Sequence, residues 1–316
     1  MAKRKTAGRS RKKSNRAVQS LIYGILALAV AAAVYFLRPY IGDLFSKNVD
    51  TGTVVTADGE LAVHFVDIGQ GDAILLRFPT GENMLVDTGD RDGNNTLVKY
   101  LKSQKIETID YLVLTHPDSD HIGEAVDVMS NFKIKRLWMS SRTSTTKTYE
   151  NILNKADGLG LEIETPFRGE TYKVGEGKFT ILSPVDGKKY DNNNNASIVM
   201  RLDYGSVSFM LTGDAEKEAE EDILSAFSSS SLHCSVLKCG HHGSSTSTSD
   251  RFLSAVSPDQ AVISCGVDNS YGHPHKETVA KLNANKIPIL RTDTMGTIVI
   301  TTDGGKITNI YKEKGN

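Results

Sequence analysis

The segment YLVLTHPDSDHIG, residues 111–123, decides how this chain folds. Its first half is a short apolar run typical of a β-strand, and its second half delivers four potential metal ligands, His116, Asp118, Asp120 and His121. Imidazole nitrogens and carboxylate oxygens spaced this closely can point at neighbouring cations, whereas on a solvated surface they would gain nothing from clustering. We therefore interpret the segment as a metal-ligand loop at a strand end. An ordinary polar turn is the alternative.

Three further segments place histidine or aspartate at or after the end of a predicted apolar strand. They are FMLTGD (209–214), VLKCGHHGS (236–244) and YGHPH (271–275), which follows a predicted strand. The first presents Asp214 before a predicted helix, and the second presents His241 and His242 between glycines that let the backbone approach a site closely. A lone Asp after a strand is most often a helix N-cap. Four such strand ends in one domain instead predict loops that converge on one edge of the fold.

The remaining pattern alternates strands and helices. Strands are predicted at 61–67, 73–78, 84–87, 110–115, 134–139, 179–182, 197–203, 207–212, 234–238, 261–264, 287–290, 297–301 and 306–311. Helices are predicted at 95–104, 122–130, 146–157, 215–227, 249–256 and 275–284. Runs of strands interrupted by helices in both halves predict an α/β (α+β) fold, with two mixed sheets packed face to face and helices outside. The asparagine run at 192–195 is interpreted as a loop only.

Composition limits the kinds of partner and site. The three cysteines, Cys234, Cys239 and Cys265, form no CxxC pair, so they are expected in the core rather than at a thiolate metal site. Eight of the 37 basic residues lie in the first twenty positions, which leaves 29 basic against 38 acidic residues, a net charge of −9. A domain this acidic lacks the basic surface typical of nucleic-acid binding. Attraction to phosphates would therefore have to come from cations at the site.

The N-terminal region predicts a membrane anchor. Residues 17–37 carry no charge, and as a helix they would span about 31 Å, the thickness of a bilayer core. We expect a basic cytoplasmic tail at 1–16, a transmembrane helix at 17–38, a linker at 39–59 and an exported domain at 60–316, because basic residues cluster before the span. A cleavable signal peptide is the main alternative, but its apolar region is usually about 7–15 residues long. The flanking charges also disfavour a buried core helix.

Taken together, these segments resemble the metallo-β-lactamase fold superfamily, and specifically the extracellular hydrolase domain of the ComEC family of competence proteins. The matching segments are VHFVDIGQGDA (63–73), LVDTG (85–89), HPDSDH (116–121), NASIV (195–199), LTGD (211–214), HHGS (241–244) and GHPH (272–275). They extend over nearly all of the predicted exported domain. The resemblance implies a four-layer αβ/βα metallo-β-lactamase sandwich, preceded here by one N-terminal transmembrane helix.

The chain also departs from the superfamily pattern. The usual loop has a histidine where this chain has Asp118, and the usual third-motif histidine has no counterpart near residues 195–197. Both changes match the ComEC branch, exchange nitrogen for oxygen and favour Mn²⁺ alongside Zn²⁺. The match lacks the multi-span channel of a full competence protein. A separate DNA-uptake channel protein is therefore a partner that the resemblance suggests.

The resemblance further implies two divalent metal ions, Zn²⁺ or Mn²⁺. Their implied ligands are His116, Asp118, Asp120, His121, Asp214 as the bridge and, among the late histidines, His242 and His273. Spacing along the chain does not decide which of the four late histidines is a ligand. Two such cations can activate a shared water and clamp the oxygens of a phosphodiester. Roles in catalysis are expected for Asp120, Lys238 and His241. Contacts with substrate are expected for Gln70, Asp72, Ser244 and His275, although the loop at 69–72 is interpreted equally as a tight turn.

The expected function is that of a membrane-anchored, exported metal-dependent hydrolase, a phosphodiesterase or nuclease acting on DNA. Hydrolysis of another ester, such as an envelope phosphodiester, a lactone or a lactam, is the alternative within the same fold. A non-catalytic accessory module of DNA uptake is a third hypothesis. Degenerate ligands would mark such a module, and the ligand set expected for the ComEC branch is complete here.

Overall fold

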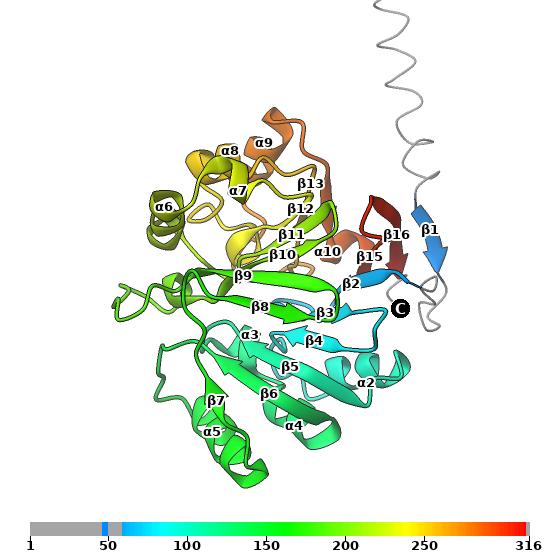
Figure 1. Ribbon diagram of the computed structural model, residues 1–316, viewed down its shortest axis with the longest axis vertical. Coiled ribbons are helices and arrows are strands. Elements are labelled where there is room, and N and C mark those ends of the chain that lie inside the picture. The colour runs from blue at the N-terminus through cyan, green and yellow to red at the C-terminus, as the bar shows by residue number, and fades with distance from the viewer. Residues whose placement is uncertain (1–45, 50–58, 314–316) are drawn as a thin grey trace, which may run out of the picture. The chain divides into compact units, whose positions relative to one another are not determined.

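The computed structural model of the chain describes residues 46–49 and 59–313 (Figure 1). The predicted tail at 1–16, the predicted transmembrane helix at 17–38 and most of the linker lie outside the described residues. Within the described residues, no helix is long and apolar enough to cross a membrane. The elements from β2 onward, residues 59–313, belong to one compact unit.

The first half of this unit supplies most of one sheet. A short strand, β1 (Ser46–Val49), precedes it in the chain. The elements that follow are β2 (Leu61–Phe65), β3 (Ile74–Arg77), β4 (Asn83–Val86), α2 (Thr96–Ser103), β5 (Thr108–Leu114), α3 (Ser119–Ile122), α4 (Ala125–Asn131), β6 (Lys133–Met139), α5 (Lys147–Leu159) and β7 (Ile163–Glu164).

The second half builds the other sheet and returns to the first. Its elements are β8 (Thr171–Val174), β9 (Gly177–Ser183), β10 (Val199–Tyr204), β11 (Val207–Leu211), α6 (Lys217–Ala226), α7 (Ser229–Leu232), β12 (Val236–Lys238), α8 (Asp250–Val256), β13 (Gln260–Ile263), α9 (Lys276–Ala284), β14 (Ile289–Arg291), α10 (Thr292–Met295), β15 (Ile298–Thr302) and β16 (Ile307–Glu313). Two short 3-10 helices lie at Asn194–Ala196 and Gly240–Gly243.

Both sheets are mixed, as the sequence predicts. The first has the order β16-β15-β2-β3-β4-β5-β6-β7 and the second β14-β13-β12-β11-β10-β9-β8. In the first sheet the strands from β4 to β7 run parallel, and in the second those from β11 to β14 do. Parallel neighbours end at the same edge of a sheet, and helices make the crossovers between them. The loops that follow β4, β5, β11, β12 and β13 therefore project from the parallel parts of the two sheets.

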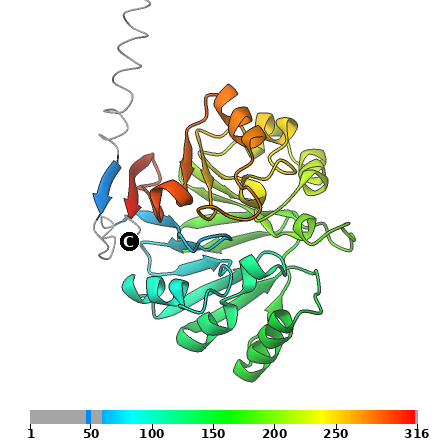
Figure 2. The same ribbon diagram turned by 180° about the vertical axis from the view of Figure 1, so that it is seen from behind.

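Alternating side chains explain why the sheets pack face to face. On β2, Leu61, Val63 and Phe65 enter the core between the sheets, together with Phe209 and Leu211 of β11. A second core lies between the first sheet and α2, α4 and α5, and a third between the second sheet and α6, α8 and α9. Helices thus cover the outer face of each sheet, which is the predicted four-layer arrangement (Figures 1 and 2). Each large apolar side chain buried in this way stabilises the fold by about 1.5–3 kcal/mol.

Several element bounds differ from those predicted. The helix expected at 122–130 is α4, which begins only at Ala125, and the unpredicted short helix α3 precedes it. A Cβ on Gly123 between them would lie 2.5 Å from the backbone nitrogen of Arg91. The loop after β4 packs against this turn so closely that only glycine fits. Strand β14 begins two residues later than expected. The prediction missed β7, β8, α7 and α10, which are too short for a periodic pattern to reveal.

Candidate metal centre

The ligand loop after β5 is held in place by Asp87 at the end of β4. The Asp87 carboxylate accepts hydrogen bonds from the Thr115 backbone nitrogen at 2.8 Å and from its hydroxyl at 2.7 Å. It also accepts one at 2.8 Å from Nδ1 of His121, which leaves Nε2 of that ring free to face the centre. Asp87 thus has a structural role. A carboxylate behind a histidine in this way is the usual partner of a metal-bound imidazole.

Asp214 lies at the middle of a buried cluster of imidazoles and carboxylates. Its Oδ1 lies 3.2 Å from His121 Nε2 and its Oδ2 lies 3.4 Å from His242 Nε2. His242 Nε2 also lies 3.2 Å from Asp120 Oδ2. Two ligands held about 2.1 Å from one tetrahedral cation lie about 3.4 Å apart, so these spacings fit the coordination of a single ion. The backbone oxygen of Ser264 accepts from His242 Nδ1 at 3.0 Å and fixes which nitrogen faces Asp214.

A second group of ligand atoms shares Asp214. His116 Nε2 lies 3.9 Å from Asp214 Oδ2 and 3.7 Å from Asp118 Oδ2. The hydroxyls of Thr115 and Ser197 lie 3.1 Å and 3.3 Å from His116 Nδ1, so Nε2 again points inward. Asp214 therefore lies between two ligand groups.

Two buried atoms of the cluster support a metal site directly. His116 Nε2 has no hydrogen-bond partner among the described residues, and Asp214 Oδ1 has none there besides the His121 imidazole at 3.2 Å, although buried polar atoms are almost always paired. Both belong to the inward-facing set, and imidazole nitrogen with carboxylate oxygen suits divalent transition metals. The residues present therefore fit a bound divalent cation.

Burial and neighbouring charges shift the pKa values of the histidines and of Asp214 in the cluster. Burial alone would lower the pKa of His121, but the carboxylates of Asp214 and Asp87 raise it well above its ordinary value, and Asp214 does the same for His242. Burial would raise the pKa of Asp214, but the two imidazoles hold it well below its usual range. Burial, followed by nearby His121, lowers the pKa of His116 to about 4. A cation entering the centre must therefore displace protons from His121 and His242.

Lys238 and Asp72 occupy positions that differ from the expected ones. Lys238 Nζ lies 2.8 Å from Asp72 Oδ2 and donates to the Cys239 backbone oxygen at 2.8 Å, and both charged side chains are completely buried. An oxygen of Asp72 lies within 4.8 Å of ligand atoms of the cluster, and its Oδ1 lies 3.5 Å from His242 Nδ1. Because Lys238 neutralises it and neither group reaches solvent, the pair supports His242 from behind. The sequence predicts substrate contact for Asp72 and a role in catalysis for Lys238, whereas the structure encloses both side chains behind the cluster.

The late histidines differ in their distance from the cluster. His241, in a left-handed conformation with φ of 48°, places Nε2 3.8 Å from Asp214 Oδ2 at the partly exposed mouth of the centre. Its Nδ1 lies 3.1 Å from Glu216 Oε1. The ring of His273 lies one step further out, with its centre 5.2 Å from that of His241 and 5.9 Å from that of His242. The structure thus places His242, rather than His273, against Asp120 and Asp214.

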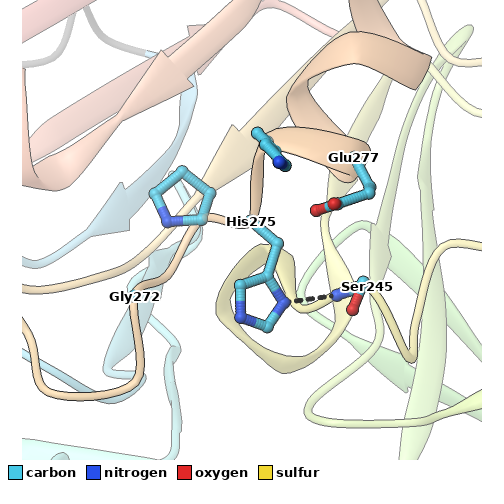
Figure 3. A pocket seen from close by; sticks show the side chains of 6 residues that line it. Ser245, Gly272, His275 and Glu277 are labelled. Carbon is cyan, nitrogen blue, oxygen red and sulfur yellow. Dashed lines mark hydrogen bonds between the residues drawn. The ribbon is translucent and has the colours of Figure 1, made fainter.

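The other residues expected to contact substrate, His275, Ser244 and Gln70, lie in loops around the mouth of the centre. Their side chains form hydrogen bonds that stabilise these loops. His275 Nδ1 accepts from the Ser245 backbone nitrogen at 2.9 Å (Figure 3), and its Nε2 lies 3.2 Å from the Tyr271 backbone oxygen. Ser244 is buried and its hydroxyl bonds within its own turn. Gln70 Oε1 accepts from the Gly266 backbone nitrogen at 3.3 Å and joins the two loops. Both ring nitrogens of His275 are therefore occupied by the backbone.

The asparagine run contributes more than a loop. Asn193 donates to Asp118 Oδ1 at 2.6 Å, and Asn195 Oδ1 accepts from the Glu216 and Ala219 backbone nitrogens at 3.1 Å each. These contacts orient one metal-ligand candidate and fix the start of α6. Repeated asparagines immediately before the NASIV match were the available signal, because Asn side chains satisfy backbone groups at loop and helix ends.

The fold and the cluster agree with a comparison to known families. Residues 66–267 match the model of the Metallo-beta-lactamase superfamily, and the chain belongs to this superfamily. With the ligand cluster, this membership identifies it as a metal-dependent hydrolase. Its fold is also similar to that of the CmlA beta-hydroxylase E377D mutant, with a TM-score of 0.50 at 13% identity over 78% of this chain and 54% of the other.

Two of the curated proteins similar to this chain are a ComE operon protein and a competence protein. The chain is 35% identical to ComE operon protein 3 of Bacillus subtilis (strain 168), over 77% of this chain and 33% of that protein. It is 32% identical to Competence protein ComA of Neisseria gonorrhoeae, over 87% of this chain and 38% of that protein. The chain therefore spans about a third of the length of these relatives.

Proposed function

We propose that the chain is a phosphodiesterase that cleaves DNA at a centre of two divalent cations and serves DNA uptake. The observation that carries the proposal is the position of Asp214 between the His116 group and the His121 group. Two cations that share a carboxylate suit in-line displacement at phosphorus, because they clamp the attacking and leaving oxygens. The names of the relatives, which include a competence protein, support DNA as the substrate.

The donor set supports Zn²⁺ or Mn²⁺ as the metals. One group combines a histidine with two carboxylates, Asp118 and Asp214, and the other combines His121 and His242 with Asp120 and the shared Asp214. Oxygen-rich sites favour Mn²⁺ more than purely nitrogen sites do. When bound, such cations supply Lewis-acid polarisation and a nucleophile at neutral pH.

The residues of the chain then have distinct tasks. Asp87 and the Ser264 carbonyl hold His121 and His242 in the orientation that coordination requires. His241 is held by Glu216 with Nε2 at the mouth, where it can stabilise charge on a phosphate oxygen or protonate the leaving oxygen.

The same proposal includes export. An uncharged run at 17–37 preceded by eight basic residues favours a single-pass anchor at 17–38, with its N-terminus in the cytoplasm and the hydrolase domain outside the cell. A separate channel protein would then carry the DNA. Protease added to intact, wall-stripped cells should remove the domain, and protection of the domain would contradict this topology.

A substrate panel tests the activity. The purified full chain, supplied with Mn²⁺ or Zn²⁺, should cleave single- or double-stranded DNA and bis(p-nitrophenyl) phosphate, and should leave a β-lactam and a lactone intact. His116→Ala should lose both bound metal and cleavage. His233→Ala, which changes an exposed histidine between α7 and the start of β12, is the matched control and should retain both. Cleavage of the lactam or lactone without cleavage of DNA would overturn the proposal.

A further inference from the structure

The loop after β13 exposes large apolar side chains beside the metal centre. Among the described residues, the two most exposed large hydrophobic side chains are Val267, at 69%, and Tyr271, at 63%, and both belong to this loop. The same loop carries His273, whose ring centre lies 5.9 Å from that of His242 in the cluster. An aromatic ring left in water at the rim of an active site marks a binding surface better than scattered exposed residues do.

The loop is held rigidly in this position. Asn269 donates to the backbone oxygens of Gly266 at 2.9 Å and His273 at 2.6 Å, and its Oδ1 accepts from the His273 backbone nitrogen at 2.9 Å. His275 ties the Tyr271 backbone to the loop after β12, with one ring nitrogen on each side. The exposure of Tyr271 is therefore built into the loop, and little conformational entropy remains to be lost when a ligand binds its ring.

Ring contacts lead from the centre to this side chain. The Tyr271 and His273 rings are stacked, with centres 5.7 Å apart and planes 17° apart. His273 in turn lies beside His241 and His242 at the mouth of the centre. When a phosphate is bound at the centre, the nucleotide joined to it therefore lies within reach of an aromatic surface. The exposed part of the Tyr271 ring is free to stack on the base of that nucleotide.

A recess of about 700 Å³ opens beside the same loop (Figure 3). It is lined by Ser245, Gly272, Pro274, His275, Lys276 and Glu277. Lys276 brings one cation to the recess of a domain whose net charge is acidic, and the recess has room for the sugar and phosphate of a flanking nucleotide. The carboxylate of Glu277, which also lines the recess, would repel a second phosphate there.

We infer that Tyr271 is a stacking platform for the base next to the scissile phosphate, and that it directs the site towards single-stranded DNA. This inference rests on the proposed phosphodiesterase function. A base in a duplex already has both faces stacked on its neighbours, whereas an unpaired base has a face to offer the ring. Stacking of one base on an aromatic side chain contributes about 1–3 kcal/mol, which corresponds to between about fivefold and 150-fold in affinity.

Kinetics of the metal-loaded full chain on a single-stranded oligonucleotide test this. Tyr271→Ala should raise KM by between about fivefold and 150-fold with little change in kcat, because the stack forms in the bound substrate and persists in the transition state. Tyr271→Phe should restore KM, since the ring is retained. Leu159→Ala, which removes an exposed apolar side chain at the end of α5, is the control and should match the wild type.

Oligonucleotides with a single abasic position, moved along the strand, locate the stacked base. At one position next to the cleaved bond, loss of the base should raise KM for the wild type and have no further effect in Tyr271→Ala, whereas effects at distant positions should add. Additive effects at every position, or an unchanged KM in Tyr271→Ala, would overturn the inference while the proposed function stands. A wild-type chain that cleaves neither DNA nor bis(p-nitrophenyl) phosphate would instead remove the proposed function itself, and the inference with it.

Discussion

Lys238 and Asp72 form a buried ion pair directly behind the metal-ligand cluster. Burial would lower the pKa of Lys238, but Asp72 raises it, and burial would raise the pKa of Asp72, but Lys238 lowers it to about 2. Both groups are therefore charged at neutral pH. Removing two charges from water costs several kcal/mol per ion, so such a pair contributes little net stability while its members strongly depend on each other.

Removing one partner should therefore expose this dependence. Lys238→Met leaves the Asp72 carboxylate buried without a counter-charge, and we expect the free energy of unfolding to fall by about 3–5 kcal/mol. The double variant Lys238→Met with Asp72→Asn should recover much of the loss in urea titrations. Lys147→Met removes a lysine from an exposed pair with Glu150 and should cost less than about 1 kcal/mol. Equal effects of the two lysine variants would contradict a buried charged pair.

Glu124 should make the free energy of unfolding depend on pH. It is almost fully buried, and burial followed by the charge of Asp92 raises its pKa to about 7. A folded-state pKa above the unfolded value means that this group contributes stability below about pH 4.5 and that the contribution is lost as the pH rises through about 7. Glu124→Gln should therefore be more stable than the wild type by less than about 1 kcal/mol at pH 5 and by about 3 kcal/mol at pH 8. Urea unfolding at the two pH values measures this, and an equal difference at both would refute it.

At the scale of elements, the turn between β2 and β3 supports the ligand loop through backbone contact. The Asp72 backbone nitrogen donates to the Asp120 backbone oxygen at 3.1 Å. Gly71 has a φ of +125°, and a Cβ there would lie only 2.2 Å from that same oxygen, whereas a Cβ on Gly69, at φ of +78°, would meet nothing within 4 Å. Backbone atoms cannot move aside as a flexible side chain can, so the turn sets the position of Asp120.

The two glycines provide a matched test. Gly71→Ala should displace the Asp120 loop and weaken metal binding at least tenfold, because Asp120 belongs to the ligand cluster. Gly69→Ala should cost only the strain of a left-handed alanine, about 1–2 kcal/mol, with metal affinity retained. Metal titration of the two variants separates the outcomes. Equal metal affinity in both would show that the turn does not position the ligand.

At the scale of the whole molecule, the centre joins the two sheets. The ligand loop at 116–121 follows β5 of the first sheet, whereas Asp214 and His242 follow β11 and β12 of the second. In the metal-free chain, contacts between protonated imidazoles and carboxylates connect these halves. Since the pKa values of His121 and His242 are raised in the fold, that contribution is present below about pH 6.5 and is lost as the pH rises through the folded-state values.

Metal should therefore stabilise the entire fold, and more so at higher pH. At a free concentration one hundred times the dissociation constant, the cation should add about 2.7 kcal/mol to the free energy of unfolding. At a fixed metal concentration the gain should be larger at pH 8 than at pH 6, because protons compete for His121 and His242. Thermal unfolding with and without a chelator measures the gain, and Asp214→Asn is the control that should lose it. A gain that is equal at both pH values would argue against these two ligands.

The sequence by itself determined the class of fold, the mixed sheets and the loop that carries His116, Asp118, Asp120 and His121, because strand patterns and ligand spacing within six residues are local properties of the chain. Only the tertiary structure decided which late histidine faces Asp214, that Lys238 is enclosed rather than exposed, and that Tyr271 is presented to solvent. Each of these depends on how loops from different strands, often more than a hundred residues apart, pack at the edges of two sheets. Spacing along the chain carries no record of that packing.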